Sequence, residues 1–186
     1  MNMGLPDPTP LVAFGYGTAA MTYGIYLAFR FPKAKNEEEE VRIKRALIAN
    51  GFAFGGIAQF VGGLLAFTLH PGSLVGALTA AIFGMLWTAI WLNEYFNADS
   101  RPLTFLDIGI AVYTFVAGFW FVHLGMKVFA FLMWSITVLV LLLTQVHGWN
   151  RLHRATGVMA LENWVVAYYL CFAIVTNAVI GTNLPL

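Results

Sequence analysis

Charge is scarce in this sequence: only 10% of its 186 residues are Asp, Glu, Lys or Arg, whereas 60% are hydrophobic. Soluble domains carry about 25% charged residues, so this composition predicts a protein solvated mainly by lipid. The net charge is +1 and no basic face recurs, which excludes the electrostatic footprint of a nucleic-acid-binding protein. A single cysteine, Cys171, excludes an intramolecular disulfide and offers no metal cluster, so we expect no metal and no other cofactor. The N-terminus has no basic region ahead of its first apolar run, which argues against a cleavable signal peptide.

Long apolar runs make up most of the chain. A bilayer core about 30 Å thick needs roughly 20 apolar helical residues to cross it, and six segments reach about that length. Because the turns between them are short, neighbouring helices should be antiparallel. The sequence therefore predicts an all-α integral membrane protein, folded as one compact six-helix bundle. The predicted spans are residues 11–29, 46–69, 74–92, 105–123, 128–146 and 162–180. We expect the last to begin at a capped, interfacial Glu162–Asn163.

The histidines give little support to enzyme chemistry. All four lie at span ends or in loops. His147 and His153 are six residues apart, not the four that would place two ligands on one helical face. His123 and His147 end consecutive antiparallel spans and should emerge on opposite sides of the membrane. We therefore interpret the histidines as interfacial and expect no enzyme activity.

The second span contains the stretch NGFAFGGIAQFVGG (50–63), which combines five glycines with one glutamine. On an α-helix with 100° per residue, Gly51, Gly55 and Gly62 fall within about 40° of one another. Such a stripe of small residues lets another helix approach closely in lipid, so we expect it to face protein. Gln59 lies on the same side, where a primary amide is costly unless it is hydrogen-bonded. Gln59 either joins helices or lines a pathway for a polar solute.

The other polar residues inside the predicted spans are uncharged and include Thr79 and Ser135. No span is expected to carry a Lys, Arg or Glu in its middle, and Asp107 lies near an end. An ion-coupled pump or a carboxylate proton relay needs such groups. A pore lined by hydroxyls, amides and aromatic rings passes small neutral or singly charged solutes without them. The pattern therefore favours a pore.

Four segments, in order along the chain, resemble the acetate uptake transporter family, whose bacterial members include the succinate–acetate permease. They are DPTPLVAFGYG (7–17), FGGIAQFVGGLL (54–65), FGMLW (83–87) and GMKVFAFLMWSITVLVLLL (125–143). The resemblance implies a homohexamer of six-helix protomers in a prokaryotic cytoplasmic (inner) membrane, with one substrate pore through each protomer. It also implies a pore constriction at Tyr16, Phe83 and Ile136, and it places the polar glutamine of the family at Gln59.

The sequence departs from the family pattern at several positions. Asp7 and Val12 replace the asparagine and glycine of the family signature at the pore entrance, and Ala66 and Leu69 stand where family permeases carry a lysine-bearing turn. The basic residues of segment 30–45 also conflict with the family topology. The positive-inside rule places both termini outside the cytoplasm, whereas the family has them inside. Either the insertion is inverted, or a partner bound to this segment overrides the rule.

The leading hypothesis is a channel or proton-linked transporter for acetate or similar small monocarboxylates, with a substrate path that includes Gln59, Ser135, Thr79 and Asp7. A second is a channel for another small polar solute, such as ammonia, urea or succinate. A third is a non-transporting accessory subunit of a membrane complex, which docks a partner through segment 30–45. The alternative for that segment is a solvated helical turn, supported by pairs such as Glu40–Lys44. We expect a small carboxylate and membrane lipid as partners, and no nucleic acid.

Overall fold

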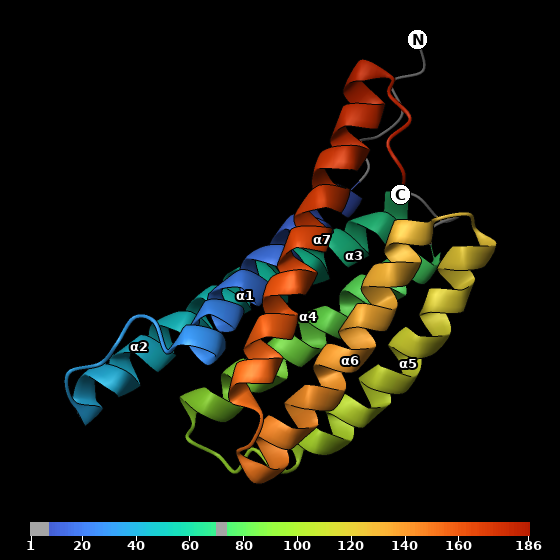
Figure 1. The fold of residues 1–186 in the computed structure, drawn as a ribbon. Coiled ribbons are helices and arrows are strands. Elements are labelled where there is room, and N and C mark those ends of the chain that lie inside the picture. The colour runs from blue at the N-terminus through green and yellow to red at the C-terminus, as the bar shows by residue number, and fades with distance from the viewer. Residues whose placement is uncertain (1–7, 70–73) are drawn as a thin grey trace.

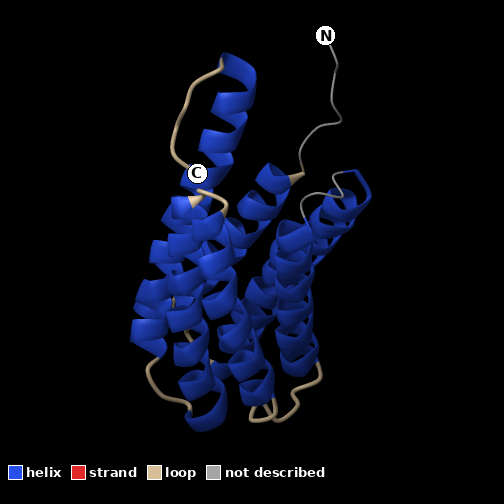
Figure 2. Cartoon of the chain, turned by 90° about the vertical axis from the view of Figure 1, so that its right-hand side faces the viewer, coloured by secondary structure: helices blue, strands red, loops and turns tan. Residues whose placement is uncertain are grey.

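The computed structural model describes residues 8–69 and 74–186, and within these ranges it consists of helices and connecting loops (Figure 2). Asp7 lies outside the described residues. In chain order the elements are α1 (Thr9–Phe29), α2 (Glu37–Asn50), η1 (Gly51–Ile57), α3 (Ala58–Leu69), α4 (Leu74–Tyr95), α5 (Leu103–His123), α6 (Lys127–Trp149) and α7 (His153–Ile180).

Six helical stretches of the described chain are long and apolar enough to cross a membrane, which confirms the predicted all-α, six-span fold. α2, η1 and α3 continue one another as a single stretch of 33 residues, Glu37–Leu69. The helices run alternately up and down the bundle, and the start of α1 and the C-terminus lie at the end opposite the α4–α5 and α6–α7 loops (Figure 1). Large apolar side chains cover the outside, among them Phe105 and Val179, which are 79% and 78% exposed. Lipid is the solvent that suits such a surface.

The charged segment after α1 is the beginning of a helix. The Asn36 side chain accepts a hydrogen bond from the Glu39 backbone N–H at 2.9 Å, which caps α2. The four glutamates of the first turn interact favourably with the positive end of the helix dipole. Glu40 and Lys44 form the predicted pair, with 3.3 Å between Oε1 and Nζ. The interpretation as a solvated helical turn is therefore confirmed for this pair, and α2 projects from the bundle (Figure 1).

The glycines of the second span lie against neighbouring helices. A Cβ at Gly55 would lie 2.5 Å from Cδ1 of Trp87 and 2.9 Å from Cβ of Ala19, and one at Gly62 would collide with Cγ2 of Val12. A Cβ at Gly51 would lie 2.8 Å from the ring of Tyr23. The segment Gly51–Ile57 is a π-helix, however, so the assumed 100° per residue does not apply across it.

α7 begins more than two turns before the predicted start of the last span. Its first residue is His153, so Glu162 and Asn163 lie inside the helix and not at an interfacial cap. The early start follows from close packing, because α1 runs along α7 and Gly157 touches the backbone of Ala28 so closely that a Cβ there would collide with it. The expectation that no span carries a Glu in its middle is therefore wrong.

Candidate solute pathway

Tyr16 on α1, Phe83 on α4 and Ile136 on α6 meet inside the bundle. They are 5%, 3% and 1% exposed, and the rings of Tyr16 and Phe83 lie 5.5 Å apart between centroids. The three side chains line two cavities, a larger one of about 350 Å³ and a smaller one of about 70 Å³. No other described residue lines both cavities. Residues from three distant parts of the sequence therefore form the partition between the two spaces.

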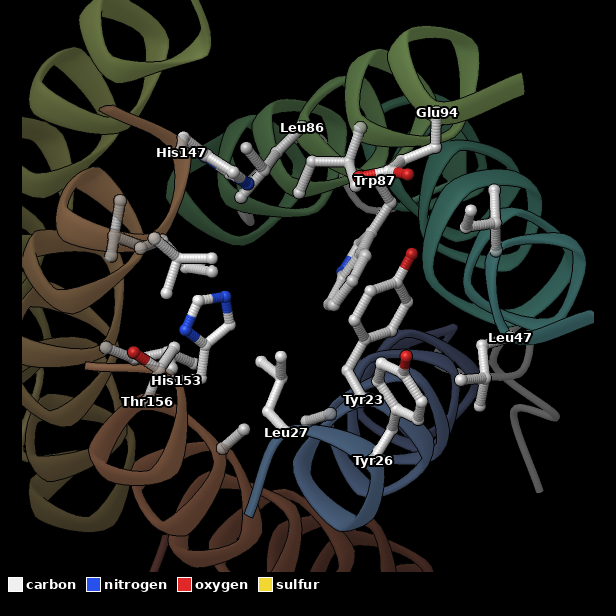
Figure 3. Close-up of a pocket in the computed structure, with 18 of the residues that line it drawn as sticks. Tyr23, Tyr26, Leu27, Leu47, Leu86, Trp87, Glu94, His147, His153 and Thr156 are labelled. Carbon is white, nitrogen blue, oxygen red and sulfur yellow. The ribbon is translucent and has the colours of Figure 1, made fainter. Parts of the chain in front are cut away.

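The larger cavity extends from this partition toward the end of the bundle that carries the α1–α2, α4–α5 and α6–α7 loops. Charged residues of both signs line it: Arg30, Glu40, Lys44 and Glu94. Lys44 is paired with Glu40, whereas Arg30 has no ion-pair partner among the described residues and lies over the Tyr26 ring at 5.7 Å. Figure 3 shows the aromatic side chains of Tyr23, Tyr26 and Trp87 on one side of the cavity and the His153 ring on the other.

The smaller cavity is lined by two polar residues that the sequence analysis assigned to the substrate path, one on the second span and one on the third. Gln59 is 1% exposed, and its Oε1 has no hydrogen-bond partner among the described residues. Thr79 also lines this cavity, but its hydroxyl lies 2.7 Å from both the Val75 carbonyl oxygen and the Tyr113 hydroxyl. Of the two, Gln59 is the one with an unpaired polar atom, and because Oε1 is an acceptor it suits a solute that carries a hydrogen-bond donor, such as a protonated carboxyl group.

A hydrogen-bonded group on α1, α6 and α7 lies behind the partition; we call Tyr16, Ser135, Glu162 and Asn163 the polar cluster. The Tyr16 hydroxyl donates to Asn163 Oδ1 at 3.0 Å. Asn163 Nδ2 shares its two protons among Ser135 Oγ at 2.8 Å, the Met159 carbonyl oxygen at 2.9 Å and Glu162 Oε2 at 3.1 Å, and Ser135 Oγ also donates to that carboxylate oxygen. Ser135 lines neither cavity and reaches the partition only through Asn163.

Sequence reasoning missed Glu162 and Asn163 because it treated them as a helix cap. A signal for the earlier start was present in HRATGVMA (153–160), which contains no proline and has Ala and Gly at positions that suit close helix packing. With α7 begun at His153, the two residues lie deep enough to face the side chains of α1 and α6.

A second buried pair joins α5 and α6. His147 Nδ1 lies 2.8 Å from Asp107 Oδ2, and the Asp107 side chain is fully buried. His147 also lines the larger cavity, so it is not simply an interfacial residue. The two positions lie near the ends of consecutive antiparallel spans on the same side of the membrane, and that spacing is a signal that the sequence already contained. The described residues include no group of three His, Cys, Asp or Glu that could hold a metal ion.

No protein-family model matches the sequence, and no curated protein matches it either. Among solved structures, the chain is similar to that of the bacterial acetate channel SatP, with a TM-score of 0.81 and 24% sequence identity over 98% of this chain and 99% of that chain. The similarity shows a shared fold over the whole length. It agrees with the family resemblance of the four sequence segments.

Proposed function

We propose that this protein, which has the fold of an acetate channel, is itself a membrane channel or transporter for acetate or similarly small monocarboxylates, and a member of the acetate uptake transporter family. The observation that carries this proposal is the partition at Tyr16, Phe83 and Ile136, with a cavity on each side of it. These are the residues that the family resemblance assigned to a constriction. A non-transporting accessory subunit has no need of two cavities that meet at one point.

In this proposal the solute enters the larger cavity, passes the constriction and leaves through the smaller cavity. Arg30 at the mouth of the larger cavity attracts an anion. The constriction removes water from the solute, and on the far side Gln59 Oε1 can accept a hydrogen bond from the carboxyl group of the protonated acid. Carrying a bare carboxylate past Phe83 and Ile136 is costly, which makes this point the barrier to flux.

The volume of the smaller cavity bears on the identity of the solute. An engineered protein cavity of about 150 Å³ holds benzene, which has six heavy atoms. By the same ratio a space of about 70 Å³ suits about three heavy atoms, close to the four of acetate. This volume favours acetate over succinate, which is twice as large. Ammonia and urea also fit by size, and they remain the alternative solutes.

Assembly and location complete the proposal. The outer surface of the bundle is rich in exposed apolar side chains such as Phe105 and Val179, a surface that suits both lipid and contacts between protomers. We propose a homohexamer with one pore per protomer in a prokaryotic cytoplasmic (inner) membrane, as the family resemblance implies.

Flux of labelled acetate into proteoliposomes tests the proposal, with protein-free liposomes as the correction for acetic acid that crosses lipid unaided. Ile136→Trp should block the flux, because the larger ring fills the constriction. Val138→Trp is the matched control, since Val138 lies on the same helix and is 48% exposed on the outside. Equal fluxes through the two variants, or no flux through the native protein, would refute the assignment.

A further inference from the structure

Two buried polar atoms on opposite sides of the partition have no hydrogen-bond partner among the described residues. They are Nε1 of Trp87, which is 7% exposed, and Oε1 of Gln59, which is 1% exposed. Of the two cavities, Trp87 lines only the larger one and Gln59 only the smaller one. An indole N–H only donates and an amide oxygen only accepts. The pathway therefore has an unused donor on one side of the partition and an unused acceptor on the other.

The two atoms lie about one helical turn apart. A Cβ at Gly55 would lie 2.5 Å from Cδ1 of Trp87, the ring atom bonded to Nε1. Gln59 follows Gly55 by four residues in the same span, which is no more than about 6 Å along the helix axis. A carboxyl or amide group that makes a hydrogen bond of about 2.9 Å at each end spans about 8 Å. One such group can therefore reach both atoms while it passes the partition.

Tyr16 adds a second acceptor at the partition. Its single hydroxyl proton is donated to Asn163 Oδ1 at 3.0 Å, so its oxygen can only accept a hydrogen bond from a solute. Tyr16 lines both cavities, and its ring lies against the ring of Phe83. The constriction thus presents one donor and two acceptors to whatever crosses it.

Small solutes differ in how well they match this set. A carboxylate has acceptors only, so it can pair with the Trp87 N–H and with neither acceptor. An undissociated carboxylic acid has a carbonyl acceptor and one O–H donor, which leaves one acceptor of the protein unpaired. A primary amide has a carbonyl acceptor and two N–H donors, which match all three groups. Acetamide has the same number of heavy atoms as acetate, so the size argument for the smaller cavity applies to it equally.

We propose that Trp87, Gln59 and Tyr16 form a hydrogen-bonding site for neutral solutes, and that the channel conducts small primary amides such as acetamide as well as undissociated carboxylic acids. Trp87 holds the carbonyl oxygen of the solute, and Gln59 and Tyr16 accept its N–H or O–H protons. The inference rests on the proposed function, because it concerns the same pathway. It adds a class of substrate and a residue, Trp87, that selects solutes by their hydrogen-bonding groups.

Acetamide carries no charge, so its flux tests the site without any change of protonation. Swelling of proteoliposomes that contain the full-length protein is followed in an acetamide gradient and corrected with protein-free liposomes. The native protein should carry acetamide. Trp87→Phe removes the N–H and keeps an aromatic ring, and Gln59→Leu removes the acceptor; each should lower the flux about three- to tenfold. Trp149→Phe is the matched control, since Trp149 is 61% exposed and lines neither cavity.

Nuclear magnetic resonance of the native protein reports the contact itself. The six tryptophans are labelled with nitrogen-15 in the indole ring, and the Trp87 signal is the one that is missing in Trp87→Phe. Acetamide should move the proton resonance of this N–H to higher frequency, because the N–H gains an acceptor, and should leave that of Trp149 in place. In Gln59→Leu the same movement should need a higher acetamide concentration. If Trp87→Phe does not fold, the native and Gln59→Leu fluxes still test the site.

The site is overturned if either folded variant carries acetamide at the native rate or faster, because a barrier set by size alone does not depend on a donor or an acceptor. It is also overturned if acetamide moves no indole signal. A native protein that carries acetate but no acetamide refutes this inference alone. One that carries neither refutes the proposed function, whereas one that carries acetamide and no acetate supports the site and refutes the assignment of acetate.

Discussion

Replacing Phe83 by Ala should join the two cavities into one continuous space. The Phe83 ring is 3% exposed, lines both cavities and lies 5.5 Å from the Tyr16 ring. Its removal frees a space of the order of the engineered cavity that holds benzene, about 150 Å³. Truncating a buried Phe to Ala costs about 3–5 kcal/mol in a dry core. We expect a value near the lower limit here, because water from the larger cavity can enter the space.

The same substitution should raise acetate flux by at least about tenfold. At the proposed constriction a carboxylate would lose hydration in passing the apolar rings. In the wider channel one water can accompany it, and a hydrogen bond to a charged group is worth about 1.5–3 kcal/mol. Since each 1.36 kcal/mol of barrier is a factor of ten in rate, a single retained water accounts for the expected gain. Larger acids should also pass, because the limit on size is lost.

The assay is uptake of labelled acetate and labelled butyrate into proteoliposomes at equal protein loading. Phe115→Ala is the matched control, since Phe115 is 52% exposed on the outside of α5 and lines neither cavity. Phe83→Ala should raise both fluxes and bring their ratio closer to one, whereas Phe115→Ala should change neither. A folded Phe83→Ala protein with the native flux and the native ratio would show that the ring is not the barrier.

Four further predictions follow from the same geometry. Gly55→Leu should disrupt folding or assembly, whereas Gly109→Leu, whose new side chain meets open space, should not; equal thermal unfolding of the two variants would contradict the packing argument. Gln59→Leu should lower acetate flux about tenfold with helicity and oligomer mass unchanged. A variant flux equal to that of the native protein would show that the Gln59 amide takes no part in the pathway. Arg30→Gln should slow acetate entry severalfold at low ionic strength and much less in 1 M salt; the same effect at both salt concentrations would exclude steering by charge. Finally, the positive-inside rule predicts that trypsin added outside intact spheroplasts leaves segment 30–45 uncut, and cleavage there would establish the inverse topology.

The fold was open to prediction because the lipid environment constrains it so strongly. A backbone in the bilayer core must satisfy its own hydrogen bonds, which leaves helices as the form for apolar runs of about 20 residues. The number and order of the six spans follow from that rule alone. The start of α2 could also have been predicted from the sequence, since Asn36 followed by four glutamates is a typical beginning of a helix.

The π-helix at Gly51–Ile57 was not predictable from the same rules. π-Helices are rare and occur mostly as short insertions within α-helices, so no local preference signals this one. It occurs where Gly55 lets the Trp87 ring approach the backbone and Gly51 lets the Tyr23 ring approach. Those contacts are made by side chains of α4 and α1. They form only when the helices pack together, so the sequence of the second span alone does not predict them.

Glu162 shows why a charged residue within an apolar run is hard to place from sequence. A search for spans treats the charge as a boundary, because an isolated carboxylate in the bilayer costs several kcal/mol. The cost is offset when neighbouring helices supply donors, and here one donor comes from Ser135 on α6. That donor lies 27 residues away in the chain, so the sequence does not reveal that the carboxylate has a hydrogen-bond donor.

The search therefore predicts that the helix begins at the charged residue, and it assigns Glu162 to the membrane interface. The packing of Gly157 against α1 decides otherwise, since it extends α7 by more than two turns and carries Glu162 to the depth of Tyr16. A residue assigned by its charge to the membrane surface is thereby set behind the proposed constriction, where Asn163 joins it to the Tyr16 hydroxyl.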